Sequence, residues 1–323
     1  AEAGCVRTES LPNPVQFNKR VLTILNPVSG AGSREDLLDT VEPSLRAHGA
    51  AHTESRITQG PEDAFDWAAA AGDEGFDVVV VGGGDGTVTA ASHGVLHSGG
   101  RLPIGILPLG TGNGLARVLG LPLDLEHTVD ALARGRTVTI DAIDLPTHGT
   151  ISLLFFGAGI DAKINRDADE EEKKRLGPFA YLKATAQNLR RARDGDLTLV
   201  FDGEERRFRG HSVSGFNATR LDVAGIPVGP DADPHDGRLD VTVFQSRNYW
   251  RTLGQILRLT NRTASRGDLE LVRSLRLDAV PPLPVQADGD VVGETPLEAK
   301  VLPRALLFIA AAEYTGDRSA ASG

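Results

Sequence analysis

The sequence predicts an α/β N-terminal domain with a doubly wound parallel sheet, followed by a mainly antiparallel β-sandwich second domain. Strand and helix signals alternate in the first third of the chain, and the strands there end in glycine-rich turns. Short strands separated by turn residues dominate from about residue 137. Alternating elements imply βαβ units, whereas closely spaced short strands are typical of a sandwich. We expect a loose tail at 1–19, the first domain at 20–136, the second at 137–302, and 303–323 packing back on the first.

Three apolar runs predict the strands of the first domain. They lie at 21–25, 76–81 and 103–107, and continuous apolar runs of this length are typical of parallel strands buried on both faces. The helix after the first strand contains Pro43, which we expect to kink it or end it early. A second helix is expected from Pro61 to about residue 73, because proline suits the first position of a helix.

The second domain shows seven strand-like segments and two helical stretches. The strand-like segments are 137–145, 150–156, 197–201, 207–216, 239–245, 275–280 and 285–287. The helical stretches are 178–193 and 249–259, and an apolar run at 302–314 follows them. Edge strands of such a β-rich domain could pair between two copies, so a homodimer is one expectation.

Composition limits the classes of function. The net charge of −10 argues against general nucleic-acid binding, which needs a basic surface. Cys5 is the only cysteine, so no internal disulfide can form and a reducing compartment is favoured. No apolar run approaches the roughly 20 residues of a membrane span. We therefore expect a cytoplasmic protein that contacts a membrane only peripherally. The stretch 179–193, with arginines at its end, could lie on a membrane surface or simply pack on a sheet.

Three glycine-rich turns at successive strand ends predict a nucleotide site. The turns are 26–32, 82–87 and 108–114, and each follows a strand and opens a helix. Ligands of open α/β sheets bind at this edge, where glycines allow a close approach and helix N-termini attract phosphate. A single turn of this kind has a structural explanation, since tight strand-to-helix turns need glycine. Three successive turns favour a phosphate site.

The pattern excludes two common kinase types. The sequence contains no G-x-x-x-x-G-K-[ST] and no protein-kinase catalytic loop, and none of its six lysines lies in the three turns. Backbone N–H groups, hydroxyls and Mg²⁺ would therefore hold the phosphates. Asp85 would repel a nucleotide unless a cation intervened, so we expect it to hold Mg²⁺ directly or through water. The alternative is an aspartate that caps the turn.

These turns carry a family resemblance. The segment 83–87 (Gly-Gly-Asp-Gly-Thr), with 26–30 and 110–113, resembles the catalytic domain of the diacylglycerol kinase family. The likeness is greatest to its soluble bacterial lipid kinases, which are related to sphingosine and ceramide kinases within the NAD kinase superfamily. Further segments at 154–162, 177–181, 230–241 and 288–290 are similar to family motifs and occur in the family's order. The resemblance covers roughly residues 20–312.

The resemblance implies a set of site residues. The residues expected to contact ATP are Asn26, Pro27, Val28, Ser29, Gly30, Thr58, Gly82, Gly83, Gly84, Asp85, Gly86, Thr87, Thr111, Gly112 and Asn113. Asp236, with the backbone carbonyls of Asp233 and Arg238, would hold a second Mg²⁺. Asp288 or Asp290 would act as the base near the acceptor hydroxyl, although Asp-Gly is also a strong hairpin-turn signal.

This sequence departs from the family pattern at three places. Thr89-Ala90 stand where the family usually has Asn-Glu. Asp290 stands where a glutamate is usual, and Gly114 stands where many members have an acidic residue. The first departure removes any contact made by the glutamate. The second leaves open which of Asp288 and Asp290 is the base.

The expected function is ATP-dependent phosphoryl transfer to a lipid hydroxyl, in a cleft between the domains and at a membrane surface. One alternative is a soluble-metabolite kinase of the same superfamily, such as an NAD kinase, which needs a polar acceptor pocket. A second alternative is a non-catalytic nucleotide-binding module, which the altered residues after Thr87 favour.

Overall fold

The computed structural model describes residues 19–27, 34–159, 194–218, 221–223, 226–228, 230, 232–245, 248–260 and 268–316. The elements of the first part are β1 (Arg20–Leu25), α1 (Arg34–Ala47), β2 (His52–Ile57), α2 (Asp63–Ala70), β3 (Val78–Gly83), α3 (Asp85–His97), β4 (Pro103–Pro108), α4 (Gly114–Val118) and α5 (Leu125–Arg134). Those that follow are β5 (Arg136–Leu145), η2 (Pro146–His148), β6 (Thr150–Ser152), β7 (Phe155–Gly159), β8 (Gly195–Phe201), β9 (Glu204–Gly210), β10 (Ser212–Phe216), β11 (Leu221–Val223), β12 (Ile226–Val228), β13 (Leu239–Phe244), α9 (Tyr249–Thr260), β14 (Glu270–Val272), β15 (Ser274–Val280), β16 (Pro284–Ala287), β17 (Asp290–Glu294) and β18 (Leu297–Ala310).

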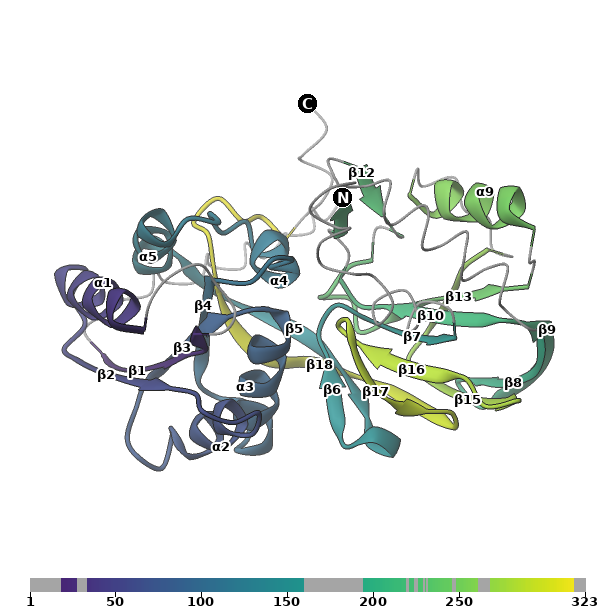
Figure 1. Cartoon of the computed structure of the whole chain (residues 1–323), viewed down its shortest axis with the longest axis horizontal. Helices are drawn as coiled ribbons and strands as arrows, with labels where there is room; N and C mark the ends of the chain where they lie inside the picture. Colours follow the sequence, from purple (N-terminus) through teal and green to yellow (C-terminus); the bar gives the residue numbers. More distant parts are fainter. Residues whose placement is uncertain are drawn as a thin grey trace, which may run out of the picture.

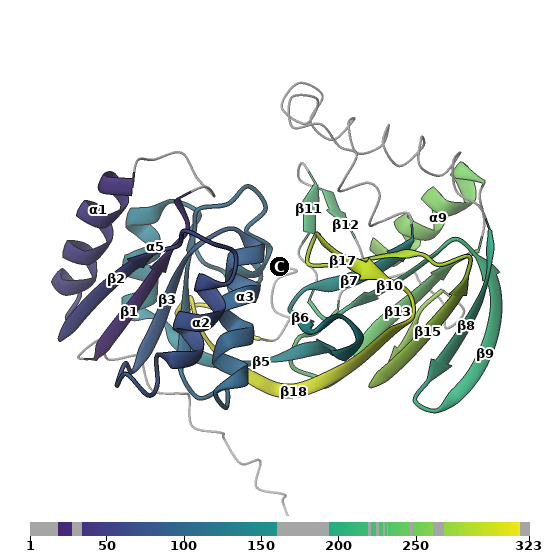
Figure 2. The same ribbon diagram turned by 60° about the horizontal axis from the view of Figure 1, so that its bottom comes forward.

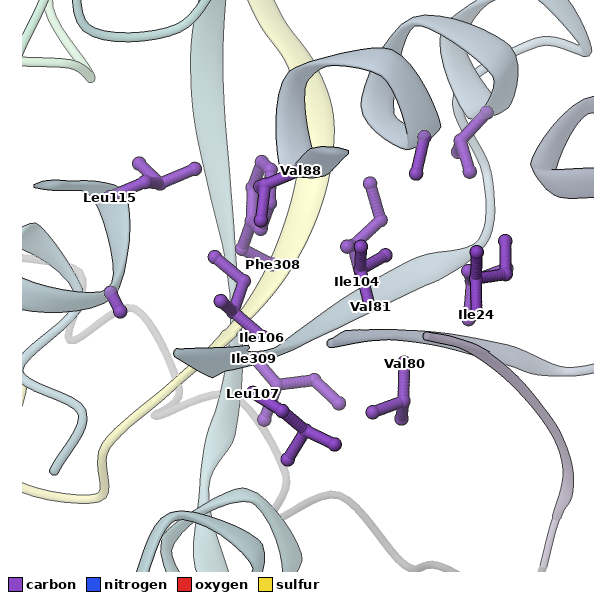
Figure 3. Packing of buried hydrophobic residues seen from close by; sticks show 14 of the residues in the cluster. Ile24, Val80, Val81, Val88, Ile104, Ile106, Leu107, Leu115, Phe308 and Ile309 are labelled. Atoms are coloured by element: carbon purple, nitrogen blue, oxygen red, sulfur yellow. The ribbon is translucent and has the colours of Figure 1, made fainter. Parts of the chain in front are cut away.

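The first part is built on four parallel strands in the order β2-β1-β3-β4. Helices α1 and α5 cover one face, and α2 and α3 cover the other (Figure 1). Every residue of β3 is buried, as expected for a central strand between two helical layers. The core between sheet and helices is mainly aliphatic, with Val81 and Ile106 among its members, and it also contains Phe308 (Figure 3). The predicted doubly wound α/β fold is confirmed.

Strand β18 continues this sheet into the rest of the molecule. Near its end it pairs parallel to β4 at Leu307–Phe308, and near its start it pairs antiparallel to β15 at 297–300. Strand β5 pairs with it along most of its length. The resulting ten-stranded sheet runs through both parts of the chain (Figure 2). The predicted division at residue 136 stays a prediction, since β5 and β18 belong to both parts.

A second sheet completes the sandwich. Its order is β14-β13-β10-β7-β16-β17, and all its pairs are antiparallel. A mainly aliphatic core fills the space between this sheet and the strands β8, β15, β5 and β18 of the first sheet. Phe156 of β7 is fully buried in this core. The predicted antiparallel sandwich is confirmed.

Some elements differ from the sequence-based expectations. Strand β2 was not expected, because an edge strand with His52, Glu54 and Arg56 lacks a continuous apolar run. Helix α1 continues past Pro43 to Ala47, so the helix does not end early; buried residues on both sides of the proline hold it in the core. The strand expected at 150–156 is two strands, β6 and β7. The helix expected at 178–193 lies outside the described residues.

Candidate active site

The glycine-rich turns meet at one edge of the parallel sheet. Their strands β1, β3 and β4 are neighbours, and the N–H of Asn26 after β1 donates to the Gly82 carbonyl of β3 at 2.7 Å. A Cβ atom on Gly110 would lie 2.5 Å from the Gly84 Cα, so the second and third turns touch through their backbones. Glycine is required at this contact because any side chain would separate the two turns. The structure thus brings the second and third turns together, with Asn26 of the first turn beside them. Val28, Ser29 and Gly30 lie outside the described residues.

Two asparagine side chains fix these turns. Asn26 donates from Nδ2 to the Thr87 hydroxyl at 2.9 Å, which joins the first turn to helix α3. Asn113, at φ 51°, accepts from the Gly110 N–H at 2.9 Å and donates to the Gly110 carbonyl at 2.7 Å. Its amide therefore braces the third turn from within, a role that the sequence did not predict. The expected nucleotide contacts of both residues stay predictions.

The second turn leads into the N-terminus of α3. Gly84 has extended backbone dihedral angles and forms the N-cap, and the helix begins at Asp85. The first N–H groups of a helix have no partners within it and carry the positive end of its dipole. Thr111 and Gly112 of the third turn are exposed beside this site. This sheet edge therefore has the donors that an anionic group requires.

Asp85 connects α3 to α4. Its Oδ1 accepts from the Gly114 N–H at 2.7 Å, so the carboxylate caps the first turn of α4. Burial raises the pKa of Asp85, and the charge of Asp288 raises it further, although the Gly114 N–H offsets part of the rise. The capping contact that we considered as an alternative is present. A second role, as a Mg²⁺ ligand, stays a prediction.

Asp288 is surrounded by hydrogen-bond donors. Its Oδ1 accepts from the Ser152 hydroxyl at 2.7 Å and from the N–H groups of Leu154 and Phe155 at 2.9 and 3.1 Å. Its Oδ2 accepts from the Leu153 N–H and from the Thr89 hydroxyl, both at 2.8 Å. Five donors fill the roughly four lone-pair positions of a carboxylate. Asp288 thereby anchors the hairpin, and few of its lone-pair positions remain for a further hydrogen bond.

Asp290 follows Asp288 in the hairpin between β16 and β17, and its surroundings differ from those of Asp288. No hydrogen bond to its carboxylate is found among the described residues. A Cβ atom on Gly86 would lie 2.6 Å from Asp290 Oδ2, so the carboxylate lies against the first turn of α3. Although Asp290 keeps an exposed surface, burial of its carboxylate raises its pKa, and the charge of Asp288 adds to the rise. Asp290 is therefore the less restrained of the two acids, and it lies beside the glycine-rich turn that opens α3.

The loop expected to hold a second metal ion lies between β12 and β13. Asp236 accepts from the Arg238 N–H at 2.8 Å, and Asp233 accepts from the His235 N–H at 3.0 Å. Burial raises the pKa of Asp236, and the charges of Asp233 and Asp141 also raise it. The described residues include no group of three or more His, Cys, Asp or Glu arranged for a metal. A site formed by one carboxylate and two carbonyls stays a prediction.

Asp141 of β5 was missed by the sequence analysis. It is fully buried, and its two oxygens accept from the N–H groups of Gly237 and Arg304 at 2.6 and 2.7 Å. Arg304 lies where the pairing of β18 with β5 shifts register, so its N–H is outside the regular ladder. Asp141 thus supports both the expected metal loop and the irregularity in β18. No local signal in the sequence marks this role.

The hydrogen bonds that Thr89 and Ser152 donate to Asp288 were also not predicted from the sequence. One sequence feature could have indicated Thr89. It follows Asp85 by four residues, and this spacing places both residues on one face of a helix. No sequence feature indicates Ser152, because it approaches Asp288 only in the folded chain.

In the part of the chain that the structure describes, no helix is both long enough and apolar enough to cross a membrane.

Comparisons with known proteins agree with this architecture. Residues 20–145 match the diacylglycerol kinase catalytic domain, and residues 155–310 match the YegS C-terminal NAD kinase beta sandwich-like domain. A diacylglycerol kinase of Mycobacterium tuberculosis is 32% identical over 297 residues, which cover 89% of this chain and 94% of that protein. A diacylglycerol kinase of Staphylococcus carnosus is 28% identical, with 87% and 91% covered. A crystal structure of a diacylglycerol kinase from Bacillus anthracis has the same fold, with a TM-score of 0.74 at 24% identity over 90% of this chain and 96% of that one.

Proposed function

Because the chain belongs to the diacylglycerol kinase family, we propose that it transfers the γ-phosphoryl group of ATP to a lipid hydroxyl at a membrane surface. The family makes the chain a phosphotransferase; ATP, the lipid and the cleft between the two parts belong to the proposal. The observation that carries it is the contact between Asp290 and Gly86. This contact puts an acid from the second part next to the phosphate-binding turn of the first.

The three turns supply the nucleotide site in this proposal. Backbone N–H groups at the start of α3, and the Thr87 hydroxyl, would bind the phosphates. The carboxylates of Asp85, Asp288 and Asp290 are close enough that Asp288 raises the pKa of the other two, so a cation fits here better than a bare nucleotide. Mg²⁺ held by Asp85 would neutralise phosphate charge. A second Mg²⁺ at Asp236 would stabilise the loop that Asp141 supports.

Asp290 is the proposed base. The lipid oxygen forms a bond to the γ-phosphorus as the bond to the β,γ-bridging oxygen breaks, ADP leaves, and the hydroxyl proton moves to the Asp290 carboxylate. The loose transition state of phosphoryl transfer allows this proton to leave late. A raised pKa suits a group that must accept a proton near neutral pH. The bonding of Asp288 favours Asp290 for this role, a choice that the sequence left open.

Gly86→Ala tests the contact between α3 and Asp290. The new methyl group would meet Asp290 Oδ2, the free end of a side chain that can rotate away. We therefore expect the protein to fold with a nearly unchanged melting temperature, while kcat falls roughly tenfold or more because the base is displaced. Steady-state kinetics and thermal unfolding measure both quantities. An unchanged kcat would show that the position of Asp290 does not matter.

The acceptor is tested with radiolabelled ATP. Purified protein is incubated with [γ-³²P]ATP and Mg²⁺, in one arm with vesicles of a mixed lipid extract and in another with NAD⁺. Label in a lipid, lost in Asp290→Asn and kept in Asp66→Asn, supports the proposal; Asp66 is an exposed acid on α2. Label in the NAD⁺ arm alone indicates the metabolite kinase instead. Binding of ATP without labelling of any acceptor indicates the non-catalytic module.

A further inference from the structure

One face of α3 contacts both acids of the β16–β17 hairpin. Thr89 donates to Asp288 at 2.8 Å, and Gly86 contacts the Asp290 carboxylate. Asp85, four residues before Thr89, lies on the same side of the helix and caps α4. The helix that begins at the phosphate-binding turn is therefore the element against which the hairpin is placed.

Within the second part, the hairpin is held by several hydrogen bonds. The Asp288 carboxylate accepts from Ser152 and from the N–H groups of residues 153–155, and its own N–H donates to the Phe155 carbonyl at 2.9 Å. The side chain of Gln286, which is fully buried, accepts from the Gly289 N–H at 2.7 Å. The bonds of Asp288 fix the hairpin to the β6–β7 connection, and the bond between Gln286 and Gly289 holds the turn of the hairpin itself. They do not fix it to α3.

We infer that Thr89 is a positioning residue, whose hydroxyl holds the hairpin at the distance from α3 that places Asp290 beside the phosphates. Among the described residues, Thr89 is the only first-part residue that donates a hydrogen bond to Asp288. The parts are also joined through β5 and β18, and Leu153 and Leu154 are buried in the core of the first part, so Thr89 adds a directional hydrogen bond to an existing contact. This inference rests on the proposed function, since it assigns Thr89 a place in that reaction.

Three variants separate positioning from simple support of the carboxylate. Thr89→Val removes the hydroxyl and keeps the shape of the side chain, whereas Thr89→Ser keeps the hydroxyl. Ser152→Ala is the matched control, because it removes a donor from the same carboxylate on the second-part side. We expect Thr89→Val to lower kcat roughly 10- to 100-fold, since small displacements of a reacting group have effects of this size. Its KM for ATP should stay within about twofold of wild type, because the three turns are untouched.

Thr89→Ser and Ser152→Ala should keep kcat within about threefold of wild type, since each leaves the contact from α3 to Asp288 in place. A kcat for Thr89→Val equal to that of wild type would overturn the inference. An equal loss in Ser152→Ala would overturn it as well, because the effect would then come from the carboxylate and not from the link to α3.

A distance measurement tests the same link without activity. Spin labels are placed at the exposed positions Arg101 and Glu205 by substitution to cysteine, in a Cys5→Ser background. Thr89→Val should broaden the distribution of distances between the labels, and Ser152→Ala should not. An unchanged distribution in Thr89→Val would overturn the inference. If the distribution broadens as expected but the wild-type protein phosphorylates no lipid, the proposed function fails and the link between the two parts stands.

Discussion

Asp290→Asn is expected to lower kcat for lipid phosphorylation by on the order of 10²–10⁴-fold, the usual contribution of a positioned base. Asparagine matches aspartate in shape but cannot accept the hydroxyl proton. The binding of ATP should change little, because the turns at the ends of β1, β3 and β4 are unaltered. Initial rates with vesicle-bound lipid, together with ATP titration, measure the two effects separately. Asp66→Asn on α2 is the control for loss of one negative charge.

The pH dependence of the wild-type enzyme provides a second check on Asp290. Burial and the charge of Asp288 raise the pKa of Asp290 above the ordinary aspartate value of 3.8. A base works only in its ionised form, so kcat/KM should fall as the pH drops through this raised pKa, at a higher pH than an ordinary aspartate gives. Full activity in Asp290→Asn, or a profile without an acid limb, would remove Asp290 from the mechanism.

Gly94→Ala is expected to produce the largest loss of stability. A Cβ atom at Gly94 would lie 2.2 Å from the Phe65 carbonyl oxygen, where α3 packs closely on α2. The obstacle is backbone, so the two helices must separate. We expect the free energy of unfolding to fall by about 3 kcal/mol, the upper part of the usual range for overpacking. The shift in the urea midpoint, followed by circular dichroism, measures it.

Gly254→Ala is the matched control for this substitution. Gly254 also lies within a helix, α9, but the nearest atom to its added Cβ is the end of the Arg258 side chain at 3.6 Å. Alanine favours a helix over glycine by roughly 1 kcal/mol, so this variant should be as stable as wild type or more stable. Equal midpoints for the two variants would mean that the contact between α2 and α3 relaxes without cost.

The parts of the fold that sequence predicts well depend on local patterns. The apolar run of β3 and the glycines after it are adjacent in sequence, and they predict the strand and the glycine-rich turn that opens α3 correctly. Strand β2 has no such run, because it lies at an edge and alternates polar residues. Helix α1 also departs from the local pattern. Buried residues on both sides of Pro43 keep the helix intact, although proline by itself favours a kink or an end.

The candidate site shows why its finer details could not be predicted. Sequence identified Asp288 and Asp290 together, but their environments come from remote segments. Thr89 is 199 residues from Asp288, and Ser152 is 136 residues away. No local pattern reports how many donors a carboxylate will receive in the folded chain. Only the tertiary arrangement distinguishes Asp288, which accepts five hydrogen bonds, from Asp290, whose carboxylate accepts none among the described residues.

Strand β18 has a consequence for how the molecule is made. It fills the position between β4 and β15, and β5 pairs along it, so neither half of the ten-stranded sheet is complete without it. During synthesis on the ribosome, β4 emerges long before β18. Until β18 is made, the edge of β4 that pairs with it has no partner strand. A fragment that ends before β18 would keep that edge exposed and tend to aggregate. We therefore expect the two halves of the sheet to unfold together rather than one after the other.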